Sequence, residues 1–289
     1  MPGFASILNP GQSVPNDKAI QVYYNTSTSQ IGLQLRDKTT PDDDSPVIFH
    51  SKDADPTGII INPSQLTATV MTSVNAIFGF TKQKTDNTGK IDVSLVSPVF
   101  ERVSTTESTN YTIASSYSKE KAWVYHLSGA DENSLKIIQV QVGGGVKSTT
   151  LSASDMRLGT SLAAYYDSKK KTNFVIYQHK AGNDGDVRHL YEYKVDSGSS
   201  KISNSGDAGK LTSLAAVYHD GKTYLYYTDN DNELRVITKD GEWGSSAAVG
   251  DANKVNSSSQ ITAVSTGDAN HIFYTDEDDS PVHLMLSYS

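Results

Sequence analysis

The sequence predicts an all-β fold, a six-bladed β-propeller, from two observations. A short strand of small residues recurs along the chain, and an aromatic, β-branched strand follows it. The copies centre on Ala68, Ala114, Ala163, Ala215 and Ala263, at intervals of 46, 49, 52 and 48 residues. A fixed period in this range is typical of propeller blades, and no long segment with helical periodicity competes with it.

A sixth copy of the repeat lies at the N-terminus. Residues 4–8 read as its small-residue strand, and residues 19–24 and 30–35 read as the two strands that follow. Six innermost strands that converge on one axis leave room for Ala and Ser but not for bulky side chains, which explains the composition of the recurring strand.

The rest of each repeat predicts a β-meander. Second strands are expected at 122–126, 174–177, 224–227 and 272–274, where aromatic and β-branched residues dominate. Polar turns at 229–232 and 276–279 lead into alternating third strands at 234–237 and 282–285. We therefore predict one domain, residues 1–289.

Composition narrows the classes of partner and cofactor. A formal net charge of −8 argues against nucleic acid, which is bound mainly through Lys and Arg. The chain has no cysteine and its seven histidines show no His-x-x-x-His spacing, so we expect no metal and no other cofactor. No stretch approaches the ~20 apolar residues of a membrane span and no basic, apolar leader opens the chain, so we expect no membrane partner and a cytoplasmic location. The sequence does not fix the oligomeric state.

Residues 214–243 closely resemble one blade of the fungal fucose-specific lectins, and fainter matches cover most of the chain. The resemblance implies sugar sites between blades, each with an Arg on the second strand, a Glu on the third strand and nearby Trp or Tyr. At the Arg position this sequence has Gln21, Ile77, Trp123, Phe174, Tyr224 and His271. At the Glu position it has Leu33, Val93, Ile137, Glu192, Val236 and Leu284. No blade holds both family residues.

The absence of the Arg and Glu pair favours a function other than sugar binding. Each sugar hydroxyl left without a hydrogen-bond partner would cost roughly 1–3 kcal/mol. The sequence also resembles the fungal hetero-Diels–Alderases of tropolonic sesquiterpenoid pathways, which share the lectin-like propeller without lectin sites. This resemblance implies a cofactor-independent enzyme that dehydrates a hydroxymethyl tropolone to a quinone methide and joins it to a humulene-type terpene. The implied partners are small hydrophobic polyketide and terpene substrates.

Aromatic and histidine side chains are the candidates for this chemistry, because a pericyclic enzyme needs an apolar pocket and a few hydrogen-bond donors. The candidate catalytic residues are His271, His126 and Tyr226. The candidate substrate-binding residues are Trp123, Tyr224, Gln21, Phe174 and Glu192. His219 faces either the mouth of the central channel or solvent.

Three alternatives stay open at this point. Each aromatic or histidine candidate can instead pack between blades. The protein can be a lectin with diverged specificity that binds carbohydrate through Glu192 and nearby aromatic residues. It can also be a non-catalytic interaction platform, because the fold alone does not fix function.

Overall fold

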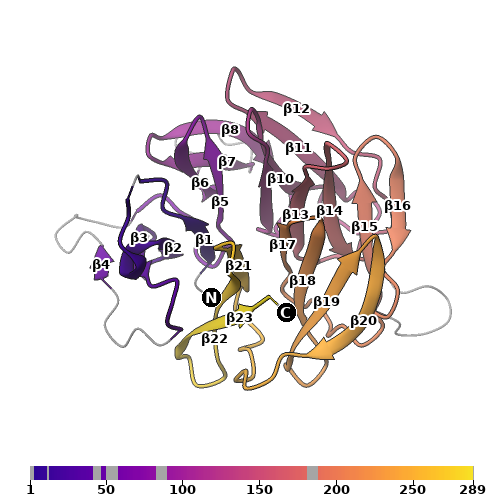
Figure 1. The fold of residues 1–289 in the computed structure, drawn as a ribbon. Coiled ribbons are helices and arrows are strands. Elements are labelled where there is room, and N and C mark those ends of the chain that lie inside the picture. Colours follow the sequence, from indigo (N-terminus) through magenta and orange to yellow (C-terminus); the bar gives the residue numbers. More distant parts are fainter. Residues whose placement is uncertain are drawn as a thin grey trace.

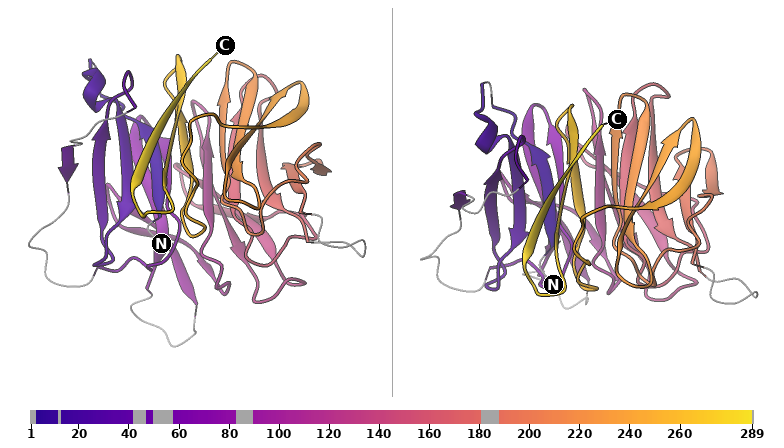
Figure 2. Two further views of the ribbon diagram at one scale, coloured as in Figure 1. Left: turned by 90° about the horizontal axis from the view of Figure 1, so that it is seen from below. Right: turned by 60° about the horizontal axis from the view of Figure 1, so that its bottom comes forward.

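The computed structural model describes residues 3–11, 13–41, 47–49, 58–82, 90–180 and 188–288. In these residues six small antiparallel sheets stand around a central axis (Figure 1). The prediction of a six-bladed β-propeller is confirmed. The sheets follow one another along the chain, and we number them blades 1 to 6. Figure 2 shows the ring from the side, with the strands running along its height.

The described strands of each blade pair in sequence order from the axis outward. The innermost strands are β1 (Phe4–Leu8), β5 (Thr67–Met71), β9 (Ile113–Tyr117), β13 (Leu162–Asp167), β17 (Ala215–His219) and β21 (Thr262–Ser265). The second strands are β2 (Ile20–Asn25), β6 (Val74–Thr81), β10 (Ala122–Ser128), β14 (Thr172–Gln178), β18 (Lys222–Thr228) and β22 (Ala269–Thr275). The short helix η1 (Asn16–Lys18) joins β1 to β2.

The outer strands complete the meanders. The third strands are β3 (Ile31–Arg36), β7 (Ile91–Ser97), β11 (Lys136–Val142), β15 (Leu190–Lys194), β19 (Leu234–Asp240) and β23 (Pro281–Ser287). The fourth strands are β4 (Val47–Phe49), β8 (Glu101–Thr106), β12 (Lys147–Thr150), β16 (Gly198–Lys201) and β20 (Glu242–Ala248). Within the described residues, blade 6 ends with its third strand, β23.

The ring closes where the first strand of the chain meets the last blade. Strand β1 lies beside β21, and the Ser6 amide donates to Thr262 Oγ1 at 3.0 Å. Figure 1 shows the N-terminus beside this junction. The two ends of the propeller are therefore held together through innermost strands, with no strand exchanged between blades in the described chain.

Gln260 strengthens this junction by bonding two blades at once. Its Oε1 accepts from the amides of Phe4 (2.8 Å) and Leu66 (3.1 Å), and its Nε2 donates to the Leu66 carbonyl (2.8 Å). Blade 1 has Gly3 at the equivalent position, where a Cβ would lie 2.3 Å from the Ser64 carbonyl oxygen. Because blade 1 has no room for a side chain there, Gln260 extends past it to blade 2.

Each blade interface has its own apolar cluster, since both faces of the second strands are covered by neighbouring blades. The clusters between blades 2 and 3, 3 and 4, 4 and 5, and 5 and 6 each contain nine or more buried residues. Between blades 6 and 1 the buried cluster consists of Ile20, Val22 and Phe273. Polar side chains fill much of this last interface, as described below.

Candidate functional site

The strand registers fix which residues are equivalent between blades. In blade 4, Glu192 pairs with Ile176, and Phe174 lies two residues before Ile176 on the same strand. The same rule places Gln21, Ala76, Trp123, Phe174, Tyr224 and His271 at equivalent second-strand positions. The third-strand equivalents of Glu192 are Leu33, Leu95, Gln139, Val236 and His283.

Four of the sequence-based assignments to these positions are therefore wrong. On the second strand of blade 2, Ala76 and not Ile77 holds the equivalent position. On the third strands, Leu95, Gln139 and His283 hold the positions that the sequence assigned to Val93, Ile137 and Leu284. In blade 2 a register shift between Ile77 and Phe78 moves the pairing. The third strands cannot be aligned by counting along the chain, because the connections before them differ in length from blade to blade.

A buried ion pair between Glu192 and Lys239 lies at the interface between blades 4 and 5. We call this pair, together with Tyr165, Phe174 and Trp243, the 4/5 site. Lys239, on β19 of blade 5, lies with its Nζ 2.5 Å from Glu192 Oε2. Their side chains are 12% and 5% exposed. Glu192 Oε1 also accepts from Tyr165 Oη at 2.5 Å. Burial, followed by the Glu192 charge, raises the pKa of Tyr165, so this hydroxyl stays a donor.

Aromatic rings enclose the ammonium group of Lys239. Its Nζ lies 4.7 Å from the Phe174 ring centroid and 5.3 Å from that of Trp243. Tyr165 stacks on Phe174 with ring centroids 4.9 Å apart. Trp243 is half-buried, and its Nε1 has no hydrogen-bond partner among the described residues. The 4/5 site therefore combines a cation, a carboxylate and a half-exposed tryptophan.

Two histidines occupy the equivalent positions at the interface between blades 6 and 1. His271 Nδ1 lies 2.9 Å from His283 Nε2, and Phe273 stacks on the His283 ring at 4.4 Å. Arg36 of blade 1 lies at this junction in the register position that Lys239 has in blade 5, and it is 7% exposed. Burial lowers the pKa of His271 to about 4 and that of His283 to about 3. Both rings are therefore neutral at pH 7.

The interface between blades 5 and 6 is aromatic. Tyr288, one residue after β23, stacks on His219 with centroids 4.4 Å apart and planes 3° apart. It also contacts Tyr224 with centroids 5.4 Å apart. Its hydroxyl donates to Asn270 Oδ1 at 2.6 Å, and Asn270 Nδ2 donates to Tyr226 Oη at 2.9 Å.

Trp123 and Gln21 serve two further interfaces. Trp123 is 9% exposed and stacks on Tyr166 of blade 4 with centroids 5.8 Å apart. Gln21 Oε1 accepts from Tyr23 Oη at 2.9 Å and from Asn75 Nδ2 of blade 2 at 2.8 Å. Both side chains pack between blades.

The three candidate catalytic residues do not meet. His126 contacts Ser104 of blade 2 (2.9 Å) and the Leu127 carbonyl, whereas Tyr226 and His271 lie at two other interfaces. Each is at most 1% exposed, so none reaches a substrate without opening a blade interface. Burial lowers the pKa of His126 to about 4. The three candidate catalytic residues therefore lie at three separate blade interfaces.

The sequence reasoning missed Lys239, Trp243 and Tyr288. Lys239 is 47 residues from Glu192, close to one blade period, so superposing the repeats by length places them at neighbouring blades. The pair was missed because the cation and the carboxylate of one site were expected on the same blade.

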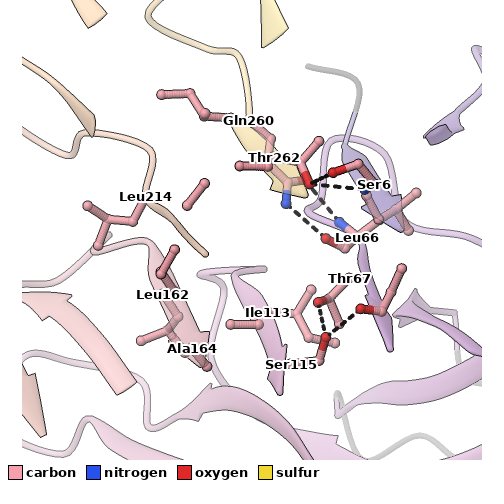
Figure 3. A pocket seen from close by; sticks show the side chains of 18 residues that line it. Ser6, Leu66, Thr67, Ile113, Ser115, Leu162, Ala164, Leu214, Gln260 and Thr262 are labelled. Atoms are coloured by element: carbon pink, nitrogen blue, oxygen red, sulfur yellow. Dashed lines mark hydrogen bonds between the residues drawn. The ribbon is translucent and has the colours of Figure 1, made fainter. Parts of the chain in front are cut away.

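The central channel is a narrow cavity of about 90 Å³ (Figure 3). Hydroxyl-bearing residues Ser6, Thr67, Ser115 and Thr262 gather on one side, and Leu and Ala of blades 4 and 5 line the other. The hydroxyls bond to one another, as in Thr67–Ser115 at 2.7 Å. Since one water occupies about 30 Å³ and drug-sized sites measure ~300–1,000 Å³, the channel is too small for two substrates.

In the described ranges, no three His, Asp or Glu side chains gather closely enough to bind a metal ion together. The one helix in those ranges is far too short to cross a membrane.

Comparison with known proteins gives a sequence likeness and a fold likeness. No family model matches the chain. The wall-associated proteinase of Coccidioides immitis (strain RS) is 25% identical over 291 residues, which is 92% of this chain and 90% of that protein. The protein of the same name from Coccidioides posadasii (strain RMSCC 757 / Silveira) is 25% identical over 244 residues, covering 78% and 75%.

Among solved structures, the Aleuria aurantia lectin aligns with a TM-score of 0.74 at 14% identity, over 98% of this chain and 91% of its own. AofleA from Arthrobotrys oligospora aligns with a TM-score of 0.70 at 14% identity, over 100% and 83%. At these identities the likeness is one of fold. The chain is a six-bladed β-propeller similar to the fungal fucose-specific lectins.

Proposed function

We propose that the protein is a carbohydrate-binding propeller that binds sugar at the 4/5 site. The observation that carries this proposal is the Glu192–Lys239 pair beside Trp243. The fucose-lectin pattern calls for a cation, a carboxylate and an aromatic ring at a blade interface. Here the cation comes from blade 5 instead of the second strand of blade 4.

The chemistry of the three groups suits sugar hydroxyls. The Lys239 ammonium has three donors, of which Glu192 takes one and Tyr165 Oη lies 3.4 Å from Nζ, so donor capacity remains for a ligand. Trp243 is half-buried, so part of its ring can pack against the apolar side of a pyranose. The name of the Coccidioides relatives, which associates them with a wall, agrees with a carbohydrate ligand.

Proteolysis, which the same name raises, has no support at the His126–Ser104 contact. A serine protease orients its histidine with a carboxylate. In this chain His126 Nδ1 contacts the Leu127 carbonyl oxygen, and the ring is fully buried. This pair therefore lacks both the orienting group and access for a peptide.

The proposal is tested by titrating the protein with methyl α-L-fucoside in a calorimeter and by screening a glycan array. We expect wild type to bind at least one glycan, and Trp243→Ala to weaken that binding about tenfold or more, because ring stacking and burial are lost. The control is Phe100→Ala, which removes a 57% exposed aromatic side chain of blade 2 and should leave affinity unchanged. Failure of wild type to bind any glycan would overturn the proposal, and equal affinity in Trp243→Ala would move the site elsewhere.

The hetero-Diels–Alder reaction is the second candidate, favoured by the aromatic interface of blades 5 and 6. His219 is half-buried there, its Nδ1 lies 3.3 Å from Ser265 Oγ, and Tyr224 supplies a ring face. In this hypothesis His219 moves the proton when water leaves the hydroxymethyl tropolone, and the rings position the quinone methide against the terpene alkene.

Incubation with a hydroxymethyl tropolone and a humulene-type alcohol tests this second candidate. If it is correct, a single enantiomer forms faster than in the protein-free reaction, and His219→Gln slows its formation while Trp243→Ala does not. Racemic product at the background rate would exclude it.

A further inference from the structure

Between blades 5 and 6 lies a slot that fits one aromatic ring, and the Tyr288 side chain of the same chain fills it. We define the 5/6 slot by the four residues that contact this side chain: His219 on β17, Tyr224 on β18, Ser265 on β21 and Asn270 on β22. His219 and Tyr224 face the Tyr288 ring, and Ser265 and Asn270 contact its hydroxyl group. None of them belongs to the 4/5 site.

The slot recognises both the face and the hydroxyl of a phenol. His219 lies parallel to the Tyr288 ring within 3°, and Tyr224 closes it at an angle of 40°. The hydroxyl lies 2.7 Å from Ser265 Oγ and donates to Asn270 Oδ1 at 2.6 Å. Because Asn270 uses its Nδ2 on the buried Tyr226 hydroxyl, its oxygen is directed into the slot as an acceptor. An apolar ring would leave this acceptor unpaired.

Tyr288 is held in the slot by few other contacts. It follows the end of β23, which is the outermost described strand of blade 6. One backbone bond, from the Tyr288 amide to the Asp268 carbonyl at 3.3 Å, ties it down, and the side chain is half-buried. Release of Tyr288 therefore disturbs no strand pairing and leaves the four slot residues in place on their own strands.

We propose that the 5/6 slot is a binding site for a small planar aromatic ligand with a hydroxyl group, and that Tyr288 is its internal competitor. A ligand of this class replaces the Tyr288 ring between His219 and Tyr224 and donates its hydroxyl proton to Asn270 Oδ1. Since Tyr288 is present at a high effective concentration, it weakens the binding of free ligand. The site is independent of carbohydrate binding.

The test uses p-cresol, which reproduces the tyrosine side chain, and toluene, which lacks the hydroxyl. We expect Tyr288→Ala to bind p-cresol at least about tenfold more tightly than wild type, because the competitor is gone. It should bind toluene about tenfold more weakly than p-cresol, because Asn270 Oδ1 then stays unpaired. Tyr288→Phe keeps the ring, so it should still exclude p-cresol more strongly than Tyr288→Ala does. Binding is followed by ligand-observed NMR.

A measurement on wild type covers the case in which Tyr288→Ala does not fold. As p-cresol is added in excess, the ring protons of Tyr288 should lose the ring-current shift imposed by His219. The proposal is overturned if folded Tyr288→Ala binds neither compound or binds both equally, or if wild type binds p-cresol as tightly as the variant. It is also overturned if the Tyr288 signals stay unchanged while p-cresol binds.

Discussion

Acidification from pH 7 to pH 5 is expected to destabilise the propeller strongly, because three histidines are buried in their neutral form. Burial lowers the pKa of His126 and His271 to about 4 and that of His283 to about 3. In the unfolded chain each returns to its ordinary value of 6.5. Between 6.5 and about 4 the unfolded state therefore binds protons that the folded state does not. The stability is fully present above pH 6.5 and falls as the pH drops below it. It stops depending on His126 and His271 below about pH 4 and on His283 below about pH 3.

The expected size of the effect follows from linkage. Each neutral histidine contributes a slope of about 1.4 kcal/mol per pH unit, or about 2 kcal/mol between pH 6.5 and pH 5. Urea unfolding at pH 8, 7, 6 and 5 measures this loss, above the range in which most carboxylates titrate. His283→Gln and His126→Gln should each reduce the slope. An unchanged slope in both variants would contradict the prediction.

The blade 6 to blade 1 interface is where protonation has its greatest effect. Its buried apolar cluster has three members, so less apolar burial holds it than the other interfaces. A proton on His283 would place a positive charge close to the Arg36 guanidinium. The resulting repulsion acts at the junction that closes the ring.

Sequence reasoning predicted the fold well because the small-residue strand and the blade period depend on steric limits near the axis. The predicted first strand, 4–8, coincides with β1, although it lies farthest from the clearest repeats. The third strands were harder, because the connection before each one has its own length and a one-residue error reverses the face of every side chain. His283 was missed at the Glu position for this reason.

The interfaces could not be read from single blades, because their contacts join residues about one blade period apart. Glu192 was identified as a remnant of a lectin site, but its partner Lys239 is on the next blade. Tyr288 has no repeat counterpart that would mark it. His126, Tyr226 and His271 lie on equivalent second strands, yet those strands belong to blades 3, 5 and 6, so their side chains cannot converge.

Removal of the Lys239 ammonium is expected to cost about 3–5 kcal/mol of unfolding free energy, because it leaves the buried Glu192 carboxylate without a counter-charge. Lys239→Met keeps most of the side-chain volume between Phe174 and Trp243 and so isolates the charge. Urea unfolding at pH 7 gives the value. The control is Lys222→Met, whose ion pair with Asp240 is 3.8 Å long and half-exposed, and which should lose less than about 1 kcal/mol.

The double variant Lys239→Met/Glu192→Gln separates the charge from the packing. The introduced glutamine carries no charge and its amide oxygen still accepts from Tyr165, so the double variant should regain at least half of the stability that Lys239→Met loses. If instead the two substitutions destabilise additively, the pair is not coupled and the prediction fails. Because both charged groups have been removed, the double variant should not regain glycan binding. Recovered stability without recovered binding would therefore separate the structural contribution of the pair from its proposed contribution to sugar recognition.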